Sequence, residues 1–187
     1  MPSRFTCPVY TADVGRISYN RPVRVLTKMF DYYVGEQNSG NVITVPAGYC
    51  SDGASVPRLL YFVISPWGKY AQAAILHDLL YSTQKLYGEK RRTRKECDLI
   101  FRMAIKDIGR NLDEDDTQNS YSKRGTISAW FGWAAVRAFG YFSYRDGPKN
   151  YGERAKKVHA RALKKEQTEL ANQIILKACD LPENLNL

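Results

Sequence analysis

The chain of 187 residues has no long apolar run. A membrane-spanning helix needs about 18 or more consecutive, mostly apolar residues, and no stretch of this sequence reaches that length. Residues 1–7 also lack the charged and then apolar pattern of a secretory leader. These two absences predict a protein with no transmembrane segment that is not secreted by a signal peptide.

Cysteine and histidine are scarce. The four cysteines are scattered, with no Cys-x-x-Cys pair, which argues against a zinc knuckle and a dense disulfide framework, so we expect reduced thiols. Only His77 and His159 are present, and neither belongs to a His-Glu-x-x-His motif, which disfavours zinc hydrolysis. The Gly-x-Ser-x-Gly motif of many serine hydrolases is absent as well.

Positive charge is in excess, because 28 Lys and Arg residues face 19 Asp and Glu, a formal net charge of +9. Such a balance attracts phosphates on lipids or nucleic acid, or an acidic protein surface, without choosing among them. No RNA-binding or helix-turn-helix signature accompanies it, so a nucleic-acid-binding role rests on charge alone. The length and the 44% hydrophobic content fit one ordinary core.

The N-terminal part of the chain favours strands. Segments 23–27, 30–34 and 42–45 are rich in β-branched and aromatic residues. The last two flank an interval that contains Asn-Ser-Gly, which predicts a β-hairpin. A tight loop over residues 47–53 is expected next, and then a short helix with Ser55 as candidate cap and Pro57 in its first turn.

In the rest of the chain, apolar residues recur at helical spacing. Helices are predicted over residues 69–86, 93–108 and 122–142. In the third, large and small apolar residues recur at a spacing that predicts a core-facing stripe: Ile127, Trp130, Phe131, Ala134, Ala138 and Phe142. A long helix over residues 153–178 has a thin apolar face and many basic residues, as is typical of a solvated arm or of an element that docks on another subunit.

These elements together predict the α+β class. We expect N-terminal antiparallel strands, including the hairpin, packed on a helical core with a long C-terminal helix. The domain covers residues 1–145, and residues 146–187 form a basic helical extension.

One polar group interrupts the apolar stripe of each central helix. His77 shares a face with Tyr81, and Asp98 stands where an aliphatic side chain is expected on the next helix. Because an unpaired buried polar group costs roughly 2–7 kcal/mol, we expect His77 and Asp98 to face each other and hydrogen-bond, with Tyr81 able to donate to Asp98. Such a dyad can serve general-base catalysis, or it can simply satisfy two buried polar groups.

Other charged residues near the pair have competing interpretations. Asp78 points about 100° away from His77 around the helix, so it is a candidate ligand for a cation such as calcium, together with the loop 49–53. The basic loop that contains Arg91, Arg92 and Arg94 is a solvated loop or an anion-binding substrate site. Asp52 and Arg58 are candidates for a salt bridge that shapes the preceding loop.

The two sequence boxes at residues 51–58 and 77–81, followed by Asp98 and Phe101, resemble a phage and prophage family known as domain of unknown function 1353. The likeness covers about residues 42–140 and includes Asp52, Ser55, Pro57 and Arg58. It implies a phage-encoded protein, often from the tail or lysis region, and supplies no established activity.

The helix with His77-Asp78-x-x-Tyr81 and the later Asp98 is also similar to the calcium-dependent phospholipase A family that cleaves the sn-2 ester. That resemblance implies His77 as the base that activates water, Asp98 as its orienting partner, Asp78 as a calcium ligand and Tyr81 as a support for Asp98. The glycine-rich calcium loop of that family has no clear counterpart here.

Three functions are therefore carried forward. The first is a virion component of the tail or its attachment apparatus, in the virion or the host cytoplasm. It is expected to be oligomeric or part of an assembly, and to contact other phage structural proteins through the C-terminal helix. The alternative is a calcium-dependent phospholipase-like ester hydrolase that uses the His77–Asp98 dyad. The third is a basic nucleic-acid-binding accessory protein.

Overall fold

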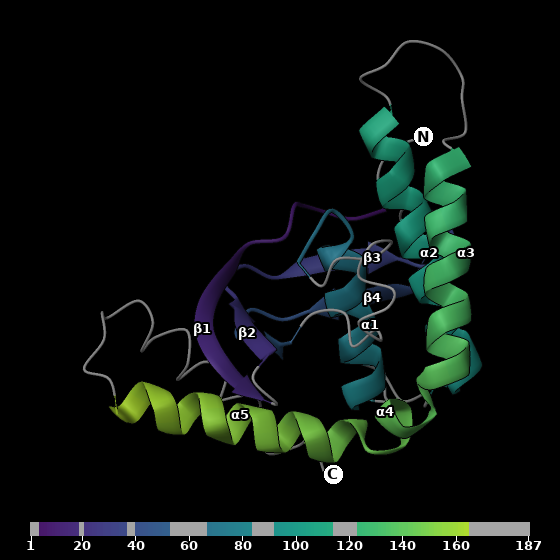
Figure 1. Cartoon of the computed structure of the whole chain (residues 1–187). Helices are drawn as coiled ribbons and strands as arrows, with labels where there is room; N and C mark the ends of the chain where they lie inside the picture. Colours follow the sequence, from purple (N-terminus) through teal and green to yellow (C-terminus); the bar gives the residue numbers. More distant parts are fainter. Residues whose placement is uncertain are drawn as a thin grey trace.

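The computed structural model describes residues 4–18, 21–36, 40–52, 67–83, 92–113 and 123–164. It has the predicted α+β class, with strands in the N-terminal half followed by helices (Figure 1). The expected helix after Ser55 and the chain beyond residue 164 lie outside the described residues. The strands are β1 (Thr11–Ser18), β2 (Arg21–Leu26), β3 (Phe30–Tyr33), β4 (Val42–Val45) and β5 (Cys50–Ser51), and the helices are α1 (Ala71–Thr83), α2 (Arg94–Asp113), α3 (Lys123–Phe139), α4 (Tyr141–Arg145) and α5 (Gly147–Lys164).

The strands form two small antiparallel sheets, one in the order β1-β2-β5 and one made of β3 and β4. The predicted hairpin is confirmed, because Phe30 pairs with Val45 and Tyr33 with Val42. The loop predicted over residues 47–53 contains a short strand instead. Gly48 has a φ of 87° and its N–H donates to the Leu26 carbonyl at 2.7 Å, which turns the chain back so that β5 pairs with β2.

Helix α1 is the most enclosed element and lies in the middle of the molecule (Figure 1). Ten of its 13 residues are buried, which explains why its sequence is apolar on almost every face. It packs against α2 on one side and α5 on another. His77, Tyr81 and Ser82 on this helix are therefore held in the core.

Helix α2 begins with a capping box. The backbone N–H of Thr93 donates to the Glu96 carboxylate at 2.7 Å, and the N–H of Glu96 donates to the Thr93 hydroxyl at 3.3 Å. The helix continues through Gly109 to Asp113, so the predicted end at residue 108 was too early. Its predicted inner stripe is confirmed for Asp98, Phe101 and Ile105, which are buried.

The predicted helix over residues 122–142 is broken at Gly140, and α4 begins after it. Gly140 lies against the preceding helix and against α1, because a Cβ on it would meet the Val136 carbonyl and lie 2.7 Å from the Tyr81 hydroxyl oxygen. Only glycine fits this close approach without displacing a neighbour.

The face that α3 turns to the core is the opposite of the one predicted. Ala129, Gly132 and Ala135 are buried, whereas the predicted stripe is largely exposed, with Ile127 at 53%, Trp130 at 50%, Phe131 at 42% and Phe142, now on α4, at 64%. The small residues permit a close approach between α3 and α2, which pack extensively. The expectation of a core-facing aromatic stripe was therefore wrong.

Helix α5 lies along the three-stranded sheet and α1 (Figure 1). Val158 is buried in a small cluster with Val23, Val25 and Cys50, and Tyr151 stacks on Tyr49 with ring centroids 5.0 Å apart. The described part of the predicted extension thus packs on the domain. Among the helices that the structure describes, none combines the length and the apolar character needed to cross a membrane.

Candidate functional site

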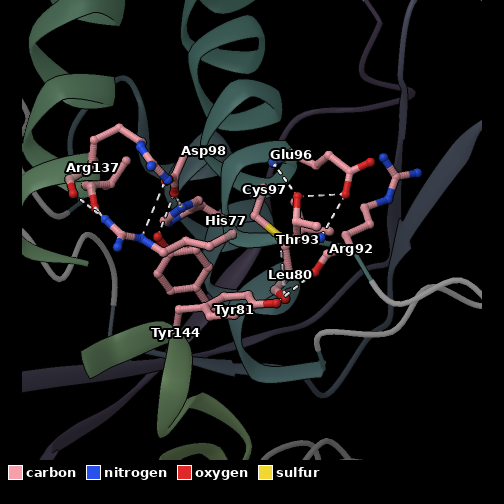
Figure 2. Close-up of polar contacts among 12 residues, drawn as sticks. His77, Leu80, Tyr81, Arg92, Thr93, Glu96, Cys97, Asp98, Arg137 and Tyr144 are labelled. Atoms are coloured by element: carbon pink, nitrogen blue, oxygen red, sulfur yellow. Dashed lines mark hydrogen bonds and ion pairs between the residues drawn. The ribbon is translucent and has the colours of Figure 1, made fainter. Parts of the chain in front are cut away.

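Asp98 is the centre of a polar cluster that joins three helices (Figure 2). Its fully buried carboxylate lies 3.1 Å from Nε2 of His77 and accepts a hydrogen bond from the Tyr81 hydroxyl at 2.6 Å. Nη1 of Arg137 donates to the second carboxylate oxygen at 2.9 Å, and Nε of Arg94 lies 3.7 Å from that oxygen. The predicted contact between His77 and Asp98 is present, and one carboxylate connects α1, α2 and α3.

The side chains around Asp98 determine its charge. Burial alone would raise the pKa of Asp98, but the hydrogen bonds from His77, Tyr81 and Arg137 outweigh it and hold the pKa below the ordinary 3.8. The Tyr81 hydroxyl has a strongly raised pKa because it is buried and next to Asp98, so it stays protonated and donates. Asp98 is therefore an ionised acceptor at neutral pH.

His77 is held between aromatic rings. Its ring centroid lies 4.0 Å from that of Tyr81 and 4.7 Å from that of Phe101. Burial lowers the pKa of His77, although Asp98 opposes this, so the imidazole is neutral at pH 7. Because an ionised carboxylate only accepts, the proton lies on Nε2, and no described residue hydrogen-bonds to Nδ1.

Arg94 also fixes the end of α3. Its Nη2 donates to the carbonyl of Val136 at 3.2 Å and to that of Arg137, both in the last turn of the helix. The Val136 carbonyl also accepts the backbone N–H of Gly140 at 2.8 Å, and a cation at the last turn interacts favourably with the helix dipole. The contacts of Arg94 and Arg137 set the rotation of α3, which explains why its aromatic side chains face away from the core.

Sequence reasoning did not assign a role to Arg137 and took Arg94 as a substrate ligand. Arg94 is four residues before Asp98 on one helix, a spacing that brings side chains together, so this contact could have been predicted from the sequence. Arg137 lies 39 residues further along the chain, and no local pattern points to it.

Asp78 lies in a second cluster, on the side of α1 that faces α5. It accepts a hydrogen bond from the Ser51 hydroxyl at 2.6 Å, and Nη1 of Arg154 lies 3.8 Å from it. Nη2 of Arg154 lies 2.7 Å from Asp52, and Nη1 donates to the carbonyl of Cys50 at 3.2 Å. Asp52 thus pairs with Arg154, and its expected pair with Arg58 is not tested, because Arg58 lies outside the described residues.

This second cluster does not fit calcium. A calcium site needs six to eight oxygen ligands without a competing cation, and here the guanidinium of Arg154 lies against both carboxylates and the carbonyl. Within the described residues, no three metal-ligating side chains converge. The cation that Asp78 meets is an arginine of the same chain.

Of the remaining predicted site residues, Arg92 is the one that the structure describes. Arg92 donates to the side chain of Asn41 at 2.7 Å. Arg91, Ser55, Pro57 and Arg58 lie outside the described residues. Cys97 is buried beside the cluster, and burial raises the pKa of its thiol to about 12, so it is not a thiolate nucleophile at neutral pH.

Comparison with known proteins gives one match. Residues 26–117 match the family described as "Protein of unknown function (DUF1353)". This part of the chain belongs to the DUF1353 family. No curated protein and no solved structure matches the chain.

The DUF1353 match contains some residues of the two polar clusters and not others. It begins in β2 and includes the β3–β4 hairpin, α1 and α2, so it starts earlier and ends earlier than the expected residues 42–140. His77, Tyr81 and Asp98 lie within it. Arg137 on α3 and Arg154 on α5, which contact the buried carboxylates, come from the part of the chain that follows it.

The stability of the fold is expected to fall with acidification. His77 and Asp98 both have lowered pKa values in the folded chain, so the unfolded chain binds more protons below their ordinary values of 6.5 and 3.8. The contribution of His77 is present above pH 6.5 and is lost as the pH falls below it, and that of Asp98 is lost below 3.8. We expect the urea midpoint to decrease between pH 7 and 5 and again below pH 4.

The variant His77→Gln tests the decrease between pH 7 and 5, because glutamine can donate to Asp98 without titrating. Its urea midpoint should change less between pH 7 and 5 than that of the wild type. Equal slopes for the two proteins in that range would contradict the assignment to His77.

Proposed function

We propose that this protein is a phage-encoded virion component, of the tail or its attachment apparatus, that works by docking and not by catalysis. The phage origin is supported by the resemblance of the two sequence boxes. The observation that carries the docking role is the outward-facing apolar surface of α3 and α4, formed by Ile127, Trp130, Phe131, Phe139, Tyr141 and Phe142, each more than 40% exposed. Monomeric soluble proteins rarely leave such a surface uncovered unless it meets a partner.

The Asp98 cluster supports the same proposal. Asp98 itself is fully buried, His77, Tyr81 and Arg137 hydrogen-bond to it, and Arg94 lies 3.7 Å away as a further counter-charge. A carboxylate held in this way connects helices and, because it is fully buried, is not exposed to a substrate. The cluster thus gives the outward surface a rigid support.

Quantitative mass spectrometry of purified particles tests this function. A phage that encodes this chain should carry it in a fixed number of copies per particle, retained through gradient purification. Loss of the protein during purification, or its presence only in the lysate, would contradict a virion role.

An ester hydrolase is the second candidate, and the state of His77 favours it. A general base must be neutral at the working pH with a free nitrogen, and His77 has a lowered pKa, an orienting bond from Nε2 to Asp98 and no described partner on Nδ1. Because Arg154 takes the place of a cation beside Asp78, this candidate is a calcium-independent hydrolase.

The hydrolase candidate predicts cleavage of short-chain and phospholipid esters that EDTA does not change. His77→Gln should then lower kcat by roughly a hundredfold or more, because general-base catalysis contributes about 10²–10⁴-fold. Met29→Ser, on the exposed surface of the strand region, is the control and should leave the rate unchanged. No cleavage by the wild type, or equal rates with His77→Gln, would remove this candidate.

A further inference from the structure

Helix α5 contacts the rest of the domain through one face. Tyr151 stacks on an aromatic ring of the domain, Arg154 forms the polar contacts given above, and Val158 is buried beside β2 and β5. These three residues follow one another at intervals of three and four, which places them on the same side of a helix. Among residues 147–158, the exposed ones are polar or charged and are Lys149, Asn150, Glu153, Lys156 and Lys157. The domain therefore meets α5 in a short pattern of an aromatic residue, an arginine and a valine.

The apolar part of this contact is small. Val158 lies in a cluster with residues of β2 and β5, separate from the larger cluster around α1 and α2, and Tyr151 borders both clusters. Release of Val158 would therefore leave the larger cluster closed. The polar contacts of Arg154 provide a large share of the attachment of α5, because hydrogen bonds from a charged donor are stronger than neutral ones.

Arg154 is the anchor of α5. Its side chain is 11% exposed, and its guanidinium lies 2.7 Å from Asp52 and 3.8 Å from Asp78 and donates to the Cys50 carbonyl at 3.2 Å. A guanidinium suits several acceptors at once because its donors form a planar fork, which the compact ammonium of lysine lacks. The three acceptors lie within the DUF1353 match over residues 26–117, whereas Arg154 follows it. The site thus belongs to the family part of the chain and its ligand to the part that follows.

The connection between α4 and α5 is a bend and not a loop. A single residue, Asp146, separates the two helices, and Figure 1 shows the chain changing direction there. The N–H of Asp146 donates to the Phe142 carbonyl and its carbonyl accepts from the Asn150 N–H, both at 2.9 Å, so helical hydrogen bonds continue across the bend. Straightening of the bend would join α4 and α5 into one helix without loss of these bonds and would carry α5 away from its own domain.

A second copy of the chain offers the same site to the released helix. Every contact that α5 makes from Gly147 onward would be repeated between the copies, as in other exchanges of an identical element. Short hinges between elements favour such exchanges. The partner that fits the site is therefore a helix with the pattern of α5, carried by a second copy.

We propose that the surface under α5 is a helix-binding site that α5 of a second copy fills, with Arg154 of one copy bound to Asp52 and Asp78 of the other. The site selects a helix that presents a guanidinium between an aromatic and an aliphatic side chain. This inference goes beyond the docking role proposed above, because it concerns α5 and not the outward surface of α3 and α4. It makes no use of the His77–Asp98 contact.

A labelled peptide of residues 147–164 probes the site in trans. The full-length variant Arg154→Ala should bind this peptide at least roughly tenfold more tightly than the wild type, whose own α5 fills the site and lowers the fraction of binding-competent protein. The peptide with Arg154→Ala should bind that variant at least roughly tenfold more weakly, because one partner of a buried charge pair is missing. The peptide with Lys156→Ala is the matched control and should bind as the unchanged peptide does, since Lys156 is exposed. Fluorescence anisotropy measures all three affinities.

Variants with complementary defects test the exchange between copies. Asp52→Asn weakens the site and keeps α5 intact, whereas Arg154→Ala weakens α5 and keeps the site intact. A mixed dimer restores one complete pair, so light scattering should detect several-fold more dimer in the mixture than in either variant alone at the same total concentration. Thermal unfolding establishes that both variants are folded, and Arg154→Lys, which keeps the charge without the planar fork, takes the place of an alanine variant that is not.

Three results would overturn the proposal. These are no peptide binding by either Arg154 variant, equal binding of the unchanged peptide and the peptide with Arg154→Ala, and peptide binding without a mixed dimer, which would reject the second copy as the occupant. A protein that shows no exchange but is retained in purified particles would reject this inference alone. Exchange by a protein that is absent from particles would reject the virion role alone.

Discussion

Asp98→Asn should lower the free energy of unfolding by about 3–5 kcal/mol, the range measured when one member of a buried ion pair is removed. The substitution keeps the shape of the side chain but removes its charge. Arg137, 2.9 Å from the carboxylate, and Arg94, 3.7 Å from it, then lose their counter-charge. The new amide N–H₂ also faces donors on His77 and Tyr81 or on Arg137, so one of these contacts becomes donor against donor.

Urea denaturation at pH 7, followed by far-UV circular dichroism, measures this loss. Asp146→Asn is the matched control, because Asp146 forms a bidentate pair with Arg145 on the surface and exposed pairs contribute little. The midpoint should change little in the control. If the two variants unfold at the same urea concentration, the Asp98 cluster does not hold the three helices together.

The local parts of the fold were predictable from the sequence. The β3–β4 hairpin follows from two β-rich segments around a turn, and the contact between His77 and Asp98 follows from one polar residue on each of two apolar stripes. Both inferences use only the pattern of residues within single strands or helices and the order of these elements along the chain. The α+β class follows from the same patterns.

The rotation of α3 was not predictable by that route. Its aromatic stripe and its small-residue face, Ala129, Gly132 and Ala135, both repeat at helical spacing, and size favours burying the aromatic one. The choice between them is made by contacts from elsewhere, namely Arg94 to the last-turn carbonyls of α3 and Arg137 to Asp98. Periodicity identifies the faces of a helix, but the partner decides which face is covered.

The contacts of the second polar cluster were not predictable either, because they join residues that are far apart in the sequence. Arg154 donates to the carbonyl of Cys50, which is 104 residues earlier in the chain, and contacts Asp52 and Asp78. Asp78 was correctly placed on a different face from His77, but its partner lies on a helix whose position no local pattern gives. The basic charge of α5 therefore has an internal role at Arg154.

Gly147→Ala should lower the free energy of unfolding by about 2–3 kcal/mol, whereas Gly152→Ala, in the same helix, should raise it by about 0.5–1 kcal/mol. A Cβ on Gly147 would meet the carbonyl oxygen of Tyr81 and lie 2.8 Å from its carbonyl carbon, and neither backbone atom can move away cheaply. A Cβ on Gly152 has no neighbour within 4 Å, so there alanine only improves helix propensity.

The opposite signs distinguish close packing from helix propensity, because both substitutions add the same methyl group to α5. The strain at Gly147 falls on Tyr81, whose hydroxyl donates to Asp98 at 2.6 Å and whose ring packs on His77. Displacement of α5 from α1 therefore also disturbs the Asp98 cluster, and Gly147→Ala should unfold at a higher pH than the wild type on acidification, because it starts from a lower stability. Thermal and urea unfolding of the two variants measure both effects, and a shift of the same sign in both would mean that α5 does not press on α1 at Gly147.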